Sequence, residues 1–231
     1  MKLKILSGGA AQGLVAALAT PFHDATGCEI DGTFSAVGAI RDKLIAGAPA
    51  DLVILTKALV EDLTRAGHVV AGSAVAVGVV LTGVAVRTGD PAPQVADPAA
   101  LRQALRAADA VYFPDPKLAT AGIHFAKVIA ELGLRDALAD RLHTFPNGAT
   151  AMRELAAVKG GRPIGCTQIT EILGTSGVTL VGPLPKELEL ATVYTLGVCT
   201  KAANRDLARQ FAAMLTDDGS RELRRRLGFQ C

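Results

Sequence analysis

The sequence predicts an α/β protein built from two lobes that are joined by two crossing strands. Strand, loop and helix patterns alternate along its 231 residues, which is typical of parallel sheets covered by helices. The segment Asp51–Leu55 is apolar after its first residue, as expected for a strand buried on both faces. Two long strand-forming stretches, Val75–Val86 and Glu189–Val198, are expected to leave one lobe and return. We therefore expect one lobe over residues 1–82 and 195–231, another over residues 83–194, and a ligand cleft between the lobes.

The first lobe is predicted to begin with three strand–helix units. In the first of these, Leu14, Val15, Leu18 and Phe22 recur at the spacing of one helix face. The predicted strands cover residues 2–6, 29–34 and 51–55, and the predicted helices lie around residues 14–22, 40–45 and 58–66. Two C-terminal helices, over residues 204–215 and 221–227, are expected to pack back onto this lobe.

The second lobe continues the alternation of strands and helices. Asp97 is a favoured N-cap residue and Pro98 suits the first helical position, so a helix is expected over Pro98–Ala107. The remaining predicted helices cover residues 120–132 and 151–159, with a helical turn through residue 172. The predicted strands cover residues 110–113, 141–145, 163–166 and 178–181.

Composition excludes several classes of protein. Half of the residues are apolar and one-fifth are charged, so a folded core is expected rather than disorder. The net charge of +2 is too small to predict nucleic-acid binding. The chain has no Trp and two Tyr, which argues against a sugar-binding site lined by aromatic rings. The apolar run Val75–Val86 is too short to cross a bilayer, which takes about 20 residues, so no membrane insertion is expected.

Neither a metal nor a cofactor is expected. The four cysteines lie far apart, and the histidines do not cluster with cysteines or carboxylates at metal-ligand spacing. No phosphate loop or dinucleotide fingerprint occurs. The opening MKLKILSGG reads as a strand entering a glycine loop rather than as a secretory signal. The sequence leaves two locations open: cytoplasmic as it stands, or periplasmic if a signal was removed.

Glycine-rich and hydroxyl-rich turns recur where predicted strands feed helices. In parallel sheets such turns lie at the carboxyl ends of the strands, where ligands bind. Helix N-termini there offer free backbone N–H groups and a partial positive charge, which together favour anions. The residues expected to contact such a ligand are Ser7, Gly8, Gly9, Ala10, Ser35, Ala36, Thr56, Thr120, Gly122, Asn147, Gly148, Ala149, Thr167 and Gln168.

Three segments resemble the molybdate-binding receptors of ABC importers. They are Gly47–Ile54 (GAPADLVI), the combination of Asp115-Pro116 with Ala121-Gly122-Ile123, and Arg226–Phe229 (RLGF). The resemblance implies two Rossmann-like lobes in the type II periplasmic-binding-protein fold, with the ligand captured by hinge closure. It also implies a monomer with a small anionic ligand, and it makes an ABC permease a candidate partner.

The expected ligand differs from molybdate because key hydroxyls are missing. The resembling family holds its oxyanion with serines in the first two loops and a tyrosine in lobe two. Here Ala10, Ala36 and Gln168 stand at those positions, and Ser7 and Ser35 lie nearby. Each lost hydrogen bond to a dehydrated oxyanion costs about 1–3 kcal/mol. An organic carboxylate is therefore the expected ligand.

Two functional hypotheses follow from these observations. The first is a solute-binding protein that serves an ABC importer. The second is an enzyme on the same scaffold, since relatives of the molybdate receptors include isomerases of small unsaturated tricarboxylic acids such as aconitate. No acid–base pair stands out in the sequence, so no catalytic residue is assigned. A ligand-sensing domain of a regulator is less favoured, because no DNA-binding segment is attached.

Overall fold

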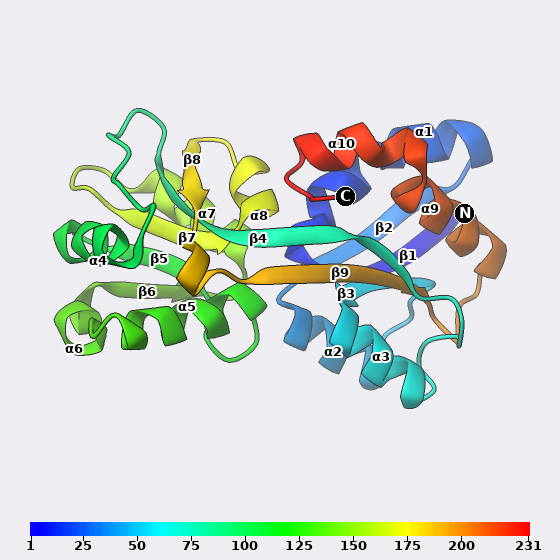
Figure 1. Ribbon diagram of the computed structural model, residues 1–231. Helices are drawn as coiled ribbons and strands as arrows, with labels where there is room; N and C mark the ends of the chain where they lie inside the picture. The colour runs from blue at the N-terminus through cyan, green and yellow to red at the C-terminus, as the bar shows by residue number, and fades with distance from the viewer. The chain divides into compact units, whose positions relative to one another are not determined.

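The computed structural model describes residues 1–231, which fold into two compact units (Figure 1). Unit 1 contains Met1–Val80 and Thr192–Cys231, and unit 2 contains Leu81–Ala191. Each unit contains strands covered by helices, which confirms the predicted α/β class.

The sheet of unit 1 has the order β2-β1-β3-β9. Its strands are β1 (Lys2–Gly8), β2 (Glu29–Ser35), β3 (Leu52–Thr56) and β9 (Ala191–Val198). Strand β1 runs parallel to β2 and β3, and β9 runs antiparallel to β3. The register pairs Gly8 with Ser35 and Thr56 with Tyr194. The carboxyl ends of the three parallel strands therefore share one edge.

Helices cover both faces of this sheet (Figure 1). They are α1 (Gln12–Thr26), α2 (Val37–Ile45), α3 (Lys57–Arg65), α9 (Arg205–Thr216) and α10 (Arg221–Arg226). Helices α1, α9 and α10 lie on one face, and α2 and α3 lie on the other. Phe22 of α1 meets Phe211 of α9 edge to face, with ring centroids 4.9 Å apart. This contact joins α9 to the core of unit 1.

The sheet of unit 2 has the order β4-β7-β5-β6, and β8 also pairs with β4. Its strands are β4 (Val75–Arg87), which continues from unit 1, β5 (Val111–Pro114), β6 (Leu142–Phe145), β7 (Ile164–Gln168) and β8 (Val178–Pro183). Strand β5 is parallel to β6 and β7, and β4 is antiparallel to β7 and β8. The ends of β5, β6 and β7 therefore share an edge.

Two separate cores flank the sheet of unit 2. The helices are α4 (Pro98–Ala107), α5 (Thr120–Glu131), the short α6 (Arg135–Leu138), α7 (Gly148–Ala157) and α8 (Ile169–Leu173). Leu101 of α4 and Phe125 of α5 belong to one core. Met152 of α7 and Ile172 of α8 belong to the other.

Local capping explains where the helices of unit 2 begin. Helix α4 starts as predicted, and the Asp97 carboxylate accepts the N–H of Ala100 at 2.8 Å. Helix α7 begins at Gly148 rather than at Ala151, because the Asn147 side chain caps it by accepting the N–H of Thr150 at 2.9 Å. The prediction of Thr167 and Gln168 as a loop is wrong, since both residues lie in β7.

Candidate functional site

The edge of unit 1 is built for close packing. Ser7 is fully buried, and its hydroxyl donates to the carbonyl of Gly8 at 2.8 Å. A Cβ on Gly8 would lie 2.8 Å from Val37 Cγ1 and 3.3 Å from Tyr194 Cε1, so glycine is needed there. Gly9 and Ala10 follow in a short 3-10 turn that leads into α1.

Alanine occupies the N-cap of two helices at this edge. Helix α1 follows Ala11 and helix α2 follows Ala36, and neither helix has a side-chain cap. Their first-turn N–H groups therefore receive no side-chain acceptor. Helix α3 differs, because the Thr56 hydroxyl accepts the N–H of Leu59 at 3.5 Å. Ser35 is partly exposed at the end of β2.

Two residues of β9 reach this edge although the sequence analysis did not select them. Tyr194 is 2% exposed, lies opposite Thr56 in the sheet and packs beside Gly8. Thr195 is 6% exposed, and its hydroxyl has no hydrogen-bond partner. The polar residues inside an apolar strand were the available signal, but only the sheet register brings them to this edge.

In unit 2, helix α5 begins tightly against the end of β5. A Cβ on Gly122 would lie 2.3 Å from the carbonyl oxygens of Pro114 and Asp115. Glycine therefore lets the first turn of α5 approach the loop after β5. The N-cap residue is Ala119, with no side-chain cap, and Thr120 is partly exposed in the first turn.

The first turn of α7 holds a carboxylate that belongs to the chain itself. Glu171 of α8 is 8% exposed, and the Thr167 hydroxyl donates to its Oε2 at 2.6 Å. The backbone N–H groups of Gly148, Ala149 and Gln168 also donate to this carboxylate. Four of the residues predicted to contact a ligand thus bind Glu171: Gly148, Ala149, Thr167 and Gln168.

Burial dominates the electrostatics of Glu171. Desolvation raises the pKa of its carboxyl above the ordinary value, and the hydrogen bonds from Thr167 and the backbone lower the pKa only in part. Gly148 makes the arrangement possible, because a Cβ there would lie 2.0 Å from both Glu171 Oε2 and Thr167 Oγ1. The expected ligand residues did not include Glu171, because Thr167 lies in β7 and Glu171 in α8, so no helical spacing pairs them.

More buried polar side chains lie near the end of β7. Gln168 is 2% exposed and pairs with Thr82 of β4 in the sheet register. Thr82 is fully buried and Thr170 is 8% exposed, and neither hydroxyl has a hydrogen-bond partner. Unpartnered buried hydroxyls are costly, so this part of unit 2 is suited to a polar ligand or to water.

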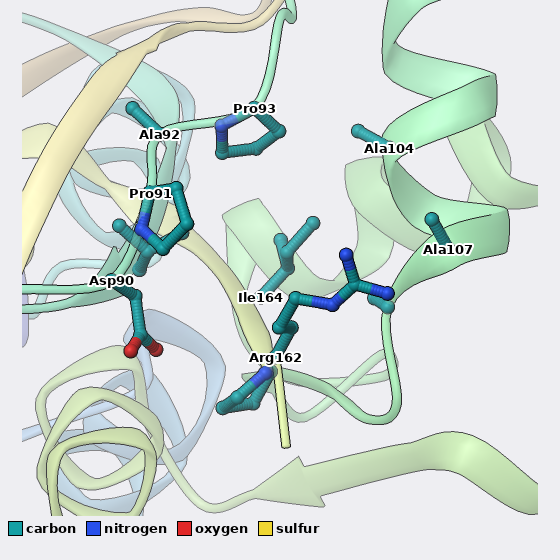
Figure 2. A pocket seen from close by; sticks show the side chains of 11 residues that line it. Asp90, Pro91, Ala92, Pro93, Ala104, Ala107, Arg162 and Ile164 are labelled. Atoms are coloured by element: carbon teal, nitrogen blue, oxygen red, sulfur yellow. The ribbon is translucent and has the colours of Figure 1, made fainter. Parts of the chain in front are cut away.

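A pocket of about 190 Å³ lies elsewhere in unit 2, near the start of β7 and the end of α4 (Figure 2). Prolines, alanines, Val86 and Ile164 form most of its lining. Asp90 is paired with Arg87 at 2.7 Å, which leaves Arg162, exposed, as the other charged lining residue. The pocket is at the amino ends of the strands, away from the candidate loops.

The structure shows no group of three or more His, Cys, Asp or Glu side chains arranged to hold a metal ion. None of its helices combines the length and apolar character that crossing a bilayer requires. All four cysteines are free; Cys28, Cys166 and Cys199 are buried, and Cys231 is exposed. His124 of α5 hydrogen-bonds through Nε2 to the carbonyl of Leu188 at 2.7 Å, which gives it a structural role.

Comparison with known proteins places these features in context. A family model described as bacterial extracellular solute-binding protein matches residues 3–230. Aconitate isomerase of a Pseudomonas species is 26% identical over 216 residues, covering 90% of this chain and 79% of that protein. The periplasmic molybdate-binding protein of Azotobacter vinelandii has a TM-score of 0.81 and 18% identity, with 99% of each chain covered. The sulfate-binding protein of Mycobacterium tuberculosis has a TM-score of 0.75 and 17% identity, covering 99% of this chain and 86% of that one.

These comparisons agree with the architecture of the chain. The molybdate- and sulfate-binding proteins confirm the periplasmic-binding-protein fold that the sequence segments imply. The family model extends over almost every element, from β1 to the residues after α10. The chain therefore belongs to the bacterial extracellular solute-binding protein family.

Proposed function

We propose that this protein binds a small organic anion with two or more carboxylates and delivers it to an ABC importer. The observation that carries the proposal is the set of uncapped helix N-termini at the two sheet edges. Ala11, Ala36 and Ala119 stand at the N-caps of α1, α2 and α5, where a polar side chain usually satisfies first-turn N–H groups. The first-turn N–H groups of α2 and α5 lack a side-chain acceptor and so suit an anionic ligand, whereas at α1 the Gln12 N–H already donates to the Gly9 carbonyl.

The side chains at these edges favour a carboxylate over a tetrahedral inorganic oxyanion. Ala10 and Ala36 are 3% and 5% exposed and offer no hydroxyl. The Ser7 hydroxyl already donates to Gly8. A dehydrated dianion needs many donors, and each unmade hydrogen bond costs about 1–3 kcal/mol. A carboxylate satisfies its two oxygens with fewer donors, since backbone N–H groups of one helix turn suffice.

Both the structural relatives and the sequence relative support an anionic ligand. The structural relatives named for molybdate and sulfate bind small anions, and the Pseudomonas relative is named for aconitate, a tricarboxylate. The resemblance to type II receptors further supports capture by hinge closure. We propose that β4 and β9 serve as the hinge strands.

A thermal-shift screen tests the ligand class. The protein is heated with molybdate, tungstate and sulfate, and in parallel with citrate, tricarballylate and trans-aconitate. A ligand at 100 times its Kd stabilises the folded state by about 2.7 kcal/mol, which is readily seen as a higher Tm. We expect the largest shift from a carboxylate. A larger shift with molybdate or tungstate would contradict the proposed ligand class.

An isomerase is the second candidate, and the aconitate isomerase relative is the observation that favours it. Isomerisation of aconitate requires a base that removes a proton from the CH2 carbon, and an acid that returns it to the former vinyl carbon as the double bond shifts. Glu171 is a buried carboxyl with a raised pKa, which suits proton transfer. Incubation with cis- or trans-aconitate, followed by absorbance and chromatography, tests the idea. Absence of turnover removes it.

A further inference from the structure

The edge of unit 2 that the proposed ligand would contact contains the buried carboxylate of Glu171. We propose that Glu171 is a proton-binding residue of the ligand site, so that the protein takes up one proton on Glu171 when a polycarboxylate binds. The inference rests on the proposed function. It deepens that function by assigning a proton as a second species bound with the ligand.

Glu171 already binds backbone donors in the first turn of α7. In the first turn of α7, the N–H of Thr150 donates to the Asn147 side chain, and the N–H groups of Gly148 and Ala149 donate to the Glu171 carboxylate. An anion reaching this turn must therefore approach the Glu171 carboxylate itself. Two carboxylates in one site cannot both remain ionised at low cost, so the pair holds a proton.

The strand order places the contacts of Glu171 on both sides of the strand that leads into α5. Glu171 follows β7 and reaches α7, which follows β6, and β5 lies between these two strands. The uncapped first turn of α5 follows β5. A ligand held at that turn is thus flanked by the two strand ends that Glu171 bridges. Thr82 lies on β4 opposite Gln168 of β7, and Thr170 lies in α8 just after β7. Their hydroxyls have no partner, and a polar ligand would provide one.

No cation compensates the Glu171 charge. The elements packed against α8 are α7, β7, β8 and, through Gly83 beside Ile169, β4, whose charged residue Arg87 is paired with Asp90. Strand β8 carries no titratable residue, and β7 carries only Cys166, whose pKa burial raises so that the thiol stays neutral. Helix α7 carries Arg153 and Glu154, and both are exposed. Arg153 donates to the Thr150 hydroxyl at 2.9 Å. The negative charge of a nearby ligand would therefore repel the Glu171 carboxylate without being offset by a cation.

The free protein already favours the protonated form more than an exposed glutamate does. Burial raises the pKa of Glu171, as the site geometry requires. A ligand anion raises this pKa further, because a like charge disfavours ionisation. Between the pKa values of the free and the bound protein, ligand affinity falls by up to about tenfold for each unit of rising pH.

Isothermal titration calorimetry with tricarballylate, a saturated tricarboxylate, measures the proton directly. Titrations at one pH in buffers of different ionisation enthalpy give the number of protons taken up, and they are repeated at increasing pH, starting near the ordinary glutamate pKa of 4.5. We expect uptake of about one proton at the pH of maximal linkage. Glu171→Gln should bind without uptake. Glu154→Gln, on the exposed side of α7, should behave as the wild type.

Thr167→Val provides a second variant if Glu171→Gln fails to fold. It removes the hydrogen bond at 2.6 Å that lowers the pKa of Glu171, so the range of proton uptake should move to higher pH. Binding of tricarballylate without proton uptake, or uptake that persists in Glu171→Gln, would overturn the inference and leave the proposed function standing. Absence of tricarballylate binding to the wild type would overturn both.

Discussion

The two sheet edges of this protein differ in what the first-turn N–H groups of their helices bind. At the edge of unit 1, small side chains leave the first turns of α1 and α2 without a cap, and no acidic side chain bonds to them. At the edge of unit 2, the first turn of α7 is capped by Asn147 and also binds the Glu171 carboxylate. The same architecture thus yields one edge that only receives negative charge and another that already contains it.

This difference separates two ways of shaping an anion site. Backbone N–H groups attract any anion, so an edge built from them alone selects mainly by size and by the number of donors. A buried carboxylate adds a condition, because the ligand must tolerate a like charge or arrive with a proton. The three predictions below test the contrast, beginning with the largest expected effect.

The substitution Gly148→Ala should disrupt the edge of unit 2 severely. Its Cβ would lie 2.0 Å from Glu171 Oε2 and Thr167 Oγ1, so the hydrogen-bonded cluster must open. We expect a loss of about 3 kcal/mol or more in the free energy of unfolding, from overpacking and from the broken buried hydrogen bonds. Urea unfolding measures it. The control is Gly13→Ala in α1, where the nearest atom is 3.7 Å away, which should leave the stability equal or slightly higher. Equal stabilities for the two variants would refute the tight cluster.

The substitution Ala36→Ser should change the edge of unit 1 in the direction of an oxyanion site. Serine at an N-cap accepts one first-turn N–H through its oxygen, so the free energy of unfolding should rise by about 1 kcal/mol, and its own O–H remains for an anion. The added hydroxyl also supplies a donor, and molybdate binding should strengthen by about tenfold. Titration of both proteins with molybdate checks this. An unchanged molybdate affinity would show that α2 does not contact the anion.

The pH dependence of stability should report Glu171 in the protein without ligand. The pKa of Glu171 is raised in the folded state above 4.5, so the folded protein binds the proton more tightly than the unfolded chain. Its contribution is fully present below about pH 4.5 and is lost as the pH rises through the folded-state pKa. The difference in the free energy of unfolding between the wild type and Glu171→Gln should therefore decrease as the pH rises over that range. A difference that is constant with pH would contradict the raised pKa.

The sequence predicted local features well and long-range contacts poorly. The start of α4 followed from Asp97 and Pro98, which act within one helical turn. Tyr194 faces Thr56 across the sheet, far apart in the chain, and only the antiparallel register of β9 brings them together. Glu171 reaches α7 in the same way, through the order of β6, β5 and β7. A spacing rule cannot foresee such pairings, because they depend on the sheet order.

The lack of hydroxyls at Ala10 and Ala36 is evident from the sequence. The binding of Glu171 to the first turn of α7 is evident only from the structure. Ala10 and Ala36 can be compared directly with the serines that the resembling receptors carry, so the expectation of a carboxylate ligand required no structure. Asn147, Gly148 and Ala149 have the composition of a ligand turn, yet the structure gives their polar groups to partners within the chain. Composition identifies available donors, and only the fold shows which donors are already used.

The central claim is that the site prefers a polycarboxylate to a tetrahedral oxyanion. Calorimetric titration of the wild-type protein with tricarballylate and with molybdate, in one buffer at one pH, tests it most directly. The account predicts that tricarballylate binds at least about tenfold more tightly, since the absent hydroxyls weaken oxyanion binding by about 1–3 kcal/mol each. Tighter binding of molybdate would contradict it.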